Sequence, residues 1–166
     1  MATVGRTIRQ GTIVGLIAFA SVALFYAAFD VLAARGTLYT VNLLGMAVFK
    51  GLRDPSVLQM PIAPDFTAIA WYSGLHLVLS LAIGLIVTGL VARAEKDPSQ
   101  SSLVLAVIVG GFLVTIAVVG VISEPIRPVL PWWSIVVANG AASTCAGVYL
   151  LRARPGIWRR LNPFLL

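Results

Sequence analysis

Five residues could carry chemistry because they are polar or ionisable and lie within or beside long apolar runs of the sequence. They are Asp30, Tyr72, His76, Glu124 and Asn139. Such groups are costly at membrane depth, so each needs a polar partner or a functional purpose. We therefore take these five residues as a candidate polar patch and ask whether the fold can bring them together.

The spacing of the polar residues suggests shared helix faces. Residues four apart lie on the same side of a helix. Three sets have this spacing: Tyr72–His76–Ser80, Asn139–Ser143 and Tyr26–Asp30. At 1.5 Å per residue, His76 and Asn139 are both expected roughly 12–14 Å below one membrane surface. If these faces converge, the protein has a polar interior that opens toward that surface.

Two interpretations of this patch stay open. In the functional one, it forms a small binding site, a proton path or a cofactor pocket. In the structural one, the side chains hydrogen-bond between helices and fix helix rotation, at roughly 0.6 kcal/mol per bond in membranes. Asp30 and Glu124, which lie near helix ends, can also simply face the wet interface.

His76 raises the question of a cofactor, because a histidine on a membrane helix is a possible haem ligand. A bis-histidine site needs a second histidine, and the chain has one. Haem would require a symmetric dimer, a histidine from another subunit or a methionine, and Met46 and Met60 lie outside the apolar runs. A metal site from His76, Asp30 and Glu124 has no supporting ligand spacing. We expect no cofactor, with His76 the only haem candidate.

Four long apolar runs must position these residues. They span 11–32, 68–91, 102–122 and 132–151, and each is long enough to cross the roughly 30 Å hydrocarbon layer as a helix. Hydrophobic residues make up 59% of the chain, charged residues 11%, and the mean hydropathy is +0.96. The sequence predicts an all-α bundle of four transmembrane helices, with residues 1–166 as one domain. The first run is too long for a signal-peptide core and is expected to remain as a helix.

Basic residues predict the orientation. With four spans, both termini and the loop near residue 97 share one side, which holds eight Lys and Arg against four on the other. The eight are Arg6, Arg9, Arg93, Lys96, Arg152, Arg154, Arg159 and Arg160, and the four are Arg35, Lys50, Arg53 and Arg127. The positive-inside rule predicts that both termini lie in the cytoplasm, and we expect the membrane to be a bacterial inner membrane. Because these charges flank apolar spans, we expect no nucleic-acid partner. Cys145 stands alone and excludes an internal disulfide.

Aromatic residues agree with this frame, and the first loop holds one further element. Trp71 with Tyr72 and Trp132 with Trp133 open two spans at the outer interface, and Trp158 is expected to anchor the cytoplasmic side. Residues 42–52 are apolar but too short to span, so we expect an interfacial or re-entrant helix there. Thr40 or Asn42 is expected to cap its start, and Gly51 its end.

Small residues recur at the spacing that lets helices approach closely. Gly11 and Gly15 form a GxxxG pair, Gly110 and Gly111 lie in the middle of the third span, and Gly140 with Thr144 repeats the spacing in the fourth. These residues predict close helix packing, within the chain or toward a partner protein.

Residues 29–49 read FDVLAARGTLYTVNLLGMAVF. This stretch is similar to a pattern in small uncharacterised bacterial four-helix membrane proteins: an acidic residue ends the first helix, a glycine-containing turn follows, and a threonine starts an apolar segment with Leu-Gly. His76 and Asn139 also resemble that group. The pattern has a proline after the threonine, where this chain has Val41. The resemblance implies the four-helix architecture and supplies no activity.

Three functions follow as hypotheses, and no catalytic set points to an enzyme. The first is a non-catalytic subunit or accessory protein within a larger bacterial membrane complex of respiratory or photosynthetic type. The second is a small oligomeric transport protein that uses the polar patch; transporters commonly show internal repeats and broken helices, and neither is evident. The third is a haem-binding electron carrier. The expected partners are the lipid bilayer and either other subunits or further copies of the chain.

Overall fold

The computed structural model describes residues 2–51 and 62–155, and in these ranges every long element is a helix. The four long helices are α1 (Ala2–Leu32), α3 (Phe66–Lys96), α4 (Ser101–Ile122) and α5 (Trp132–Ala153), and the short helix is α2 (Tyr39–Phe49). All four long helices are long and apolar enough to cross a membrane. The predicted all-α bundle with a short helix in the first loop is therefore confirmed.

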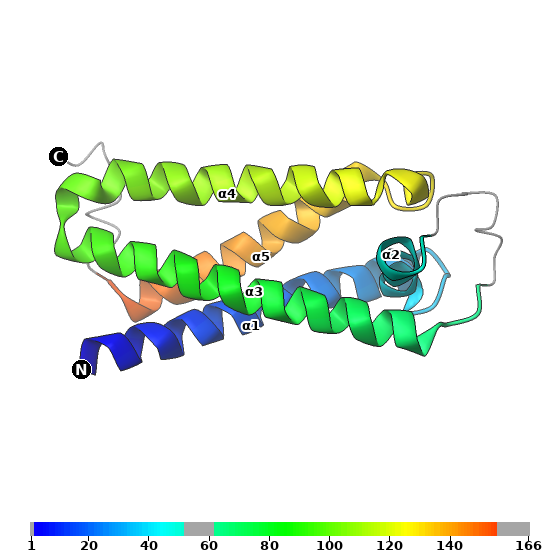
Figure 1. The fold of residues 1–166 in the computed structure, drawn as a ribbon, viewed down its shortest axis with the longest axis horizontal. Coiled ribbons are helices and arrows are strands. Elements are labelled where there is room, and N and C mark those ends of the chain that lie inside the picture. The colour runs from blue at the N-terminus through cyan, green and yellow to red at the C-terminus, as the bar shows by residue number, and fades with distance from the viewer. Residues whose placement is uncertain (1, 52–61, 156–166) are drawn as a thin grey trace.

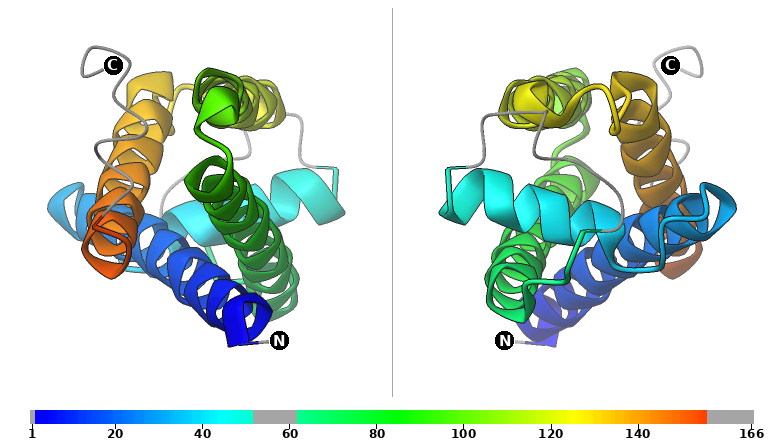
Figure 2. Two further views of the ribbon diagram at one scale, coloured as in Figure 1. Left: turned by 90° about the vertical axis from the view of Figure 1, so that its left-hand side faces the viewer. Right: turned by 90° about the vertical axis from the view of Figure 1, so that its right-hand side faces the viewer.

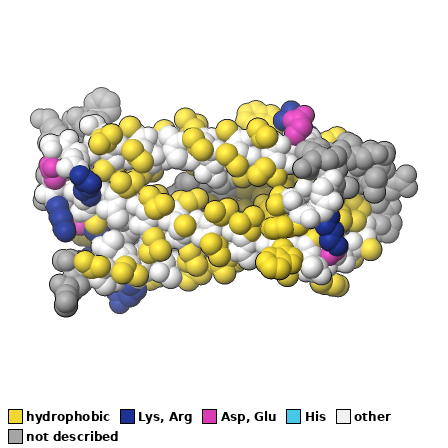
Figure 3. Space-filling view, viewed as in Figure 1, with side chains coloured by type: hydrophobic (Ala, Val, Ile, Leu, Met, Phe, Trp, Pro, Cys, Tyr) yellow, Lys and Arg dark blue, Asp and Glu magenta, His cyan; other side chains and the backbone are white. Residues whose placement is uncertain are grey.

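The helices are not packed equally tightly. Helix α1 packs against both α3 and α5, α2 lies across one end, and α4 stands apart from the others (Figures 1 and 2). Helix α4 has buried residues only near its start, at Ser101 and Val104. In its most apolar 18-residue stretch no residue is buried, whereas 22% of the corresponding stretch is buried in α3 and 28% in α5. Figure 3 shows the surface hollowed between α4 and α3.

The two ends of the bundle differ in what they carry. The N-terminus, the turn at 97–100 and the last residues of α5 lie at one end, which we call the terminal end (Figure 1). Helix α2 and the connection 123–131 lie at the opposite end, which we call the loop end (Figure 1). Charged side chains gather at both ends and apolar side chains cover the length between them (Figure 3). This distribution is the one expected of a bundle that contacts lipid.

Glycines explain how closely α1 and α3 cross. A β-carbon added at Gly84 would lie 2.5 Å from both the Gly11 carbonyl oxygen and the Gly15 nitrogen. One added at Gly15 would lie 2.7 Å from the Leu81 α-carbon. The backbones therefore touch where side chains would keep them apart, which is the packing mode of small residues in membranes. The predicted GxxxG pair packs within the chain.

Helix boundaries follow the predicted runs, with extensions at polar ends. Helix α1 begins at Ala2 rather than residue 11, because its polar first turns bond the end of α5: Arg6 Nη2 donates to the Ala153 carbonyl at 2.7 Å. Helix α3 covers Phe66–Lys96 rather than 68–91, and Asp65 caps its start, because the Asp65 carboxylate accepts the Ala68 N–H at 3.0 Å. The predicted Trp158 anchor lies outside the described residues.

The short helix begins earlier than expected, and its start is capped differently. It covers Tyr39–Phe49 rather than 42–52, so Thr40 and Asn42 lie inside it and the prediction that either caps it is wrong. The cap comes instead from Asp30, whose Oδ2 accepts the Thr40 N–H at 2.7 Å. A carboxylate at a helix N-terminus satisfies free N–H groups and favours the helix dipole. Gly51 follows the last turn with a φ of +67°, as predicted for a helix-ending glycine.

Candidate functional site

Tyr72 and His76 lie together, one turn apart on α3. Their rings are 6.4 Å apart, and the Phe19 ring of α1 lies 5.1 Å from the imidazole. Both residues are half-buried. No hydrogen bond to the imidazole is found within 2–51 and 62–155. His76 thus lies in an aromatic setting between α1 and α3.

Tyr72 connects this pair to the apolar cluster at the loop end. The cluster consists of Tyr39, Leu43, Leu44, Ile126 and Leu130, and Tyr26 and Tyr72 pack against it. The Tyr26 hydroxyl also lies 3.5 Å from the Ser134 Oγ of α5. The Tyr72 ring therefore lies between His76 and the loop-end cluster, to which α2 contributes Tyr39, Leu43 and Leu44.

Asp30 does not join Tyr72 and His76. Its side chain is 1% exposed, and both of its oxygens bind Thr40: Oδ1 accepts the Thr40 hydroxyl at 2.6 Å and Oδ2 accepts the Thr40 N–H at 2.7 Å. Asp30 is thus buried rather than at a wet interface. A carboxylate with two short hydrogen bonds from one residue fixes the turn between α1 and α2.

Asn139 and Glu124 also lie apart from the patch. The Asn139 amide donates to the Ile135 carbonyl of its own helix at 2.8 Å. Glu124 is 63% exposed and pairs with Arg127 at 3.0 Å. Of the five predicted residues, the structure brings only Tyr72 and His76 into direct neighbourhood.

A second set of polar contacts, which the sequence did not suggest, joins α2 to the start of α3. The Asn42 Nδ2 donates to the Ala63 carbonyl at 3.3 Å, and its Oδ1 accepts the Asp65 N–H at 2.9 Å. Lys50 forms an ion pair with Asp65. The hydrogen bond from Lys50 holds the pKa of the Asp65 carboxyl below its usual value. Because this pKa is lowered, the stabilisation is present at pH values above the ordinary aspartate pKa of 3.8 and is lost as the pH falls through the lowered pKa of the folded protein.

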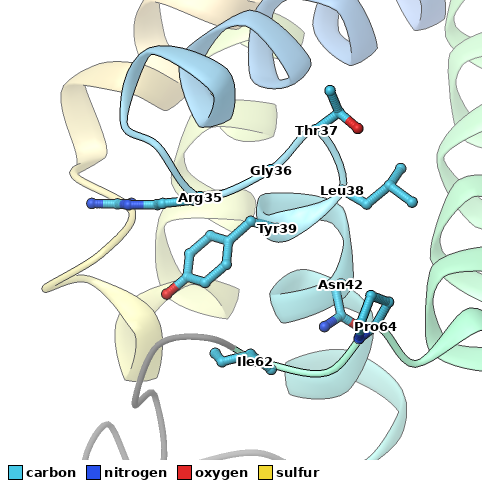
Figure 4. A pocket seen from close by; sticks show the side chains of 8 residues that line it. All are labelled: Arg35, Gly36, Thr37, Leu38, Tyr39, Asn42, Ile62 and Pro64. Atoms are coloured by element: carbon cyan, nitrogen blue, oxygen red, sulfur yellow. The ribbon is translucent and has the colours of Figure 1, made fainter.

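Arg35 borders a partly open cavity of about 200 Å³ between the α1–α2 turn and the start of α3. Its guanidinium lies 5.3 Å from the Tyr39 ring centroid and 5.9 Å from that of Phe29, and its Nη1 donates to the Val129 carbonyl at 2.7 Å. Figure 4 shows Arg35 and Tyr39 extending to one side, with Thr37 and Leu38 on the other. Arg35 therefore ties the turn to the α4–α5 connection rather than entering the cavity as a free charge.

A further polar cluster lies at the terminal end and centres on Arg154, which is 5% exposed. Its Nε donates to Gln10 at 2.8 Å, its Nη1 to Glu95 at 2.6 Å, and its Nη2 to Thr7 at 3.0 Å. From the sequence, Arg154 was predicted only to contribute to the orientation in the membrane. Its burial follows from its position just after α5, where it reaches polar residues of α1 and α3.

Within the described ranges, no three His, Cys, Asp or Glu side chains group as metal ligands would. Comparison of the chain with protein-family models, curated proteins and solved structures finds no match. The resemblance based on residues 29–49 therefore stays a prediction, and function has to be argued from the geometry.

Proposed function

We propose that this protein is a non-catalytic membrane subunit that packs against helices of other subunits in a larger bacterial membrane complex. The observation that carries the proposal is the contrast between two sets of glycines. Gly11, Gly15, Gly45 and Gly84 all lie against the backbone of another helix. Around Gly110, Gly111, Gly140 and Gly147, a β-carbon would meet nothing within 4 Å.

The surface of α5 supports the same proposal. The sequence of α5 has the lowest mean hydropathy of the four spans, 1.5 against 2.2 to 2.8 for the others. Ser143 and Thr144, next to Gly140 and Gly147 on this helix, are exposed. Small residues and hydroxyl groups gain little from lipid contact but let a second helix approach closely. We therefore infer that helices of a partner subunit cover this part of α5 and the adjoining face of α4.

The proposal includes an orientation. Described basic residues at the terminal end outnumber those at the loop end: Arg6, Arg9, Arg93, Lys96, Arg152 and Arg154 against Arg35, Lys50 and Arg127. The positive-inside rule then supports an orientation with the terminal end in the cytoplasm, and we propose that the membrane is a bacterial inner membrane.

Substitution of Gly140 with leucine is expected to remove the partner while the chain stays folded. The leucine would occupy the space that the partner helix needs, whereas a β-carbon at this position meets nothing within 4 Å in the described part of the chain. The tagged chain should be extracted from its native membrane in mild detergent and weighed by native mass spectrometry. Wild type should carry a different protein in fixed stoichiometry, and Gly140→Leu should lower its recovery by roughly tenfold, the factor that 1.4 kcal/mol produces.

Gly74→Leu is the matched control. Gly74 also has nothing within 4 Å of a β-carbon, but on α3 the residues three and four positions away from it are apolar, whereas Gly140 has the exposed hydroxyl residues Ser143 and Thr144 at that spacing. This variant should recover the partner as wild type does. A wild-type chain found only with copies of itself would contradict the proposal, as would equal recovery from Gly140→Leu.

A further inference from the structure

Helix α2 closes the loop end of the bundle over Tyr72. It crosses the ends of the long helices rather than running along them (Figure 2). Its residues Tyr39, Leu43 and Leu44 form part of the cluster against which Tyr72 packs. His76 lies one turn deeper than Tyr72, beyond the tyrosine ring. Helix α2 thus forms part of the cover over Tyr72, and over His76 one turn deeper, at this end.

Both sides of α2 are bounded by glycines in the left-handed region. Gly36 precedes the helix with a φ of +82°, and Gly51 follows it with a φ of +67°. A β-carbon at either glycine would meet nothing within 4 Å. Glycine changes its backbone angles at lower cost than other residues, so both positions are suited to act as hinges.

Two carboxylates from neighbouring segments of the chain hold α2 in place. Asp30 binds the Thr40 hydroxyl and N–H near its start, and Asp65 binds Lys50 just after its end. Asn42 adds hydrogen bonds to Ala63 and Asp65. Each tie thus connects α2 to α1 or to the segment that starts α3.

These polar ties add to the apolar packing of Tyr39, Leu43 and Leu44 in the loop-end cluster, and they are the part of the hold on α2 that single substitutions can remove. The ties to Asp30 and Asp65 have no equivalent in lipid, and hydrogen bonds to charged groups are the stronger class.

We propose that α2 is a hinged lid over Tyr72 and His76, held shut by the carboxylates of Asp30 and Asp65. When the lid opens about Gly36 and Gly51, the aromatic pair becomes accessible from the loop end. This inference does not depend on the proposed assembly role, because it concerns α2 and α3 rather than the surfaces of α4 and α5 assigned to the partner.

Thiol labelling in proteoliposomes tests the lid. In a Cys145→Ser background, Ala47→Cys places a thiol at a position of α2 that is 0% exposed. Its reaction with a maleimide should be much slower than that of Thr37→Cys, which is exposed. Adding Asp30→Asn or Asp65→Asn should speed the labelling of Ala47→Cys by roughly tenfold, because each change removes a charge-assisted tie.

Two controls separate lid opening from other effects. Glu124→Gln removes an exposed carboxylate at the same end and should leave the Ala47→Cys rate unchanged. Ala138→Cys, 0% exposed in α5, should stay unreactive in the asparagine variants. The proposal is overturned if neither asparagine variant exceeds Glu124→Gln, or if Ala138→Cys reacts together with Ala47→Cys in both, since α2 would then not open separately. If Asp30→Asn unfolds the bundle and Asp65→Asn does not, the labelling rate of Ala47→Cys in the Asp65→Asn variant decides whether the proposal holds.

Discussion

Replacing Gly84 with alanine is expected to destabilise the protein by about 3 kcal/mol, at the upper end of the usual cost of overpacking. The added β-carbon would lie 2.5 Å from the Gly11 carbonyl oxygen and the Gly15 nitrogen. Both are backbone atoms, so no side-chain rotation can make room. Helices α1 and α3 would have to separate along their crossing. Unfolding in a titration of mixed detergent micelles, followed by tryptophan fluorescence, measures the loss.

Gly89→Ala is the matched control on the same helix. Around Gly89, a β-carbon would meet nothing within 4 Å. Because alanine is the better helix former, this variant should be unchanged or more stable by at most about 1 kcal/mol. Equal stability of the two variants would show that α1 and α3 do not cross at Gly84.

Replacing Arg154 with alanine is expected to cost about 2–3 kcal/mol, less than the full cost of breaking a buried ion pair because Glu95 is 39% exposed. The change removes hydrogen bonds to Gln10, Glu95 and Thr7 and so detaches the end of α5 from α1 and α3. Arg154→Lys should recover only part of the loss, since an ammonium cannot reproduce the planar fork of a guanidinium. The same micelle titration measures both variants.

Arg152 provides the comparison for this experiment. It is an exposed arginine of the same helix end, and its replacement by alanine should change stability by no more than about 0.5 kcal/mol. If Arg154→Ala behaves like Arg152→Ala, the cluster does not hold the terminal end together.

The sequence predicted the architecture well because membrane spans leave a strong signal. Runs of about 20 apolar residues have few alternatives to a crossing helix, so all four spans could be located. Gly51 was also predictable, since a glycine after an apolar helix commonly adopts a positive φ. The start of α2 was not, because the cap comes from Asp30, ten positions upstream, and local spacing at Thr40 carries no sign of it.

The polar contacts were harder to predict because they depend on helix rotation and on long-range neighbours. A spacing of four placed Tyr72 and His76 on one face, and the structure keeps them together. The same argument could not show that Asn139 bonds its own helix. Arg154 pairs with residues 59 to 147 positions away, so its role is visible only once α1, α3 and α5 are packed.

The separation of the two ends of the bundle by a lipid bilayer is the claim on which the rest depends. Single cysteines at Thr37 and Ser99, both exposed and at opposite ends, test it in a Cys145→Ser background. In sealed vesicles whose outer face corresponds to the outside of the cell, a membrane-impermeant maleimide should label Thr37→Cys at once. Ser99→Cys should react only after the vesicles are opened. Labelling of both thiols in sealed vesicles would contradict a bundle that crosses the membrane.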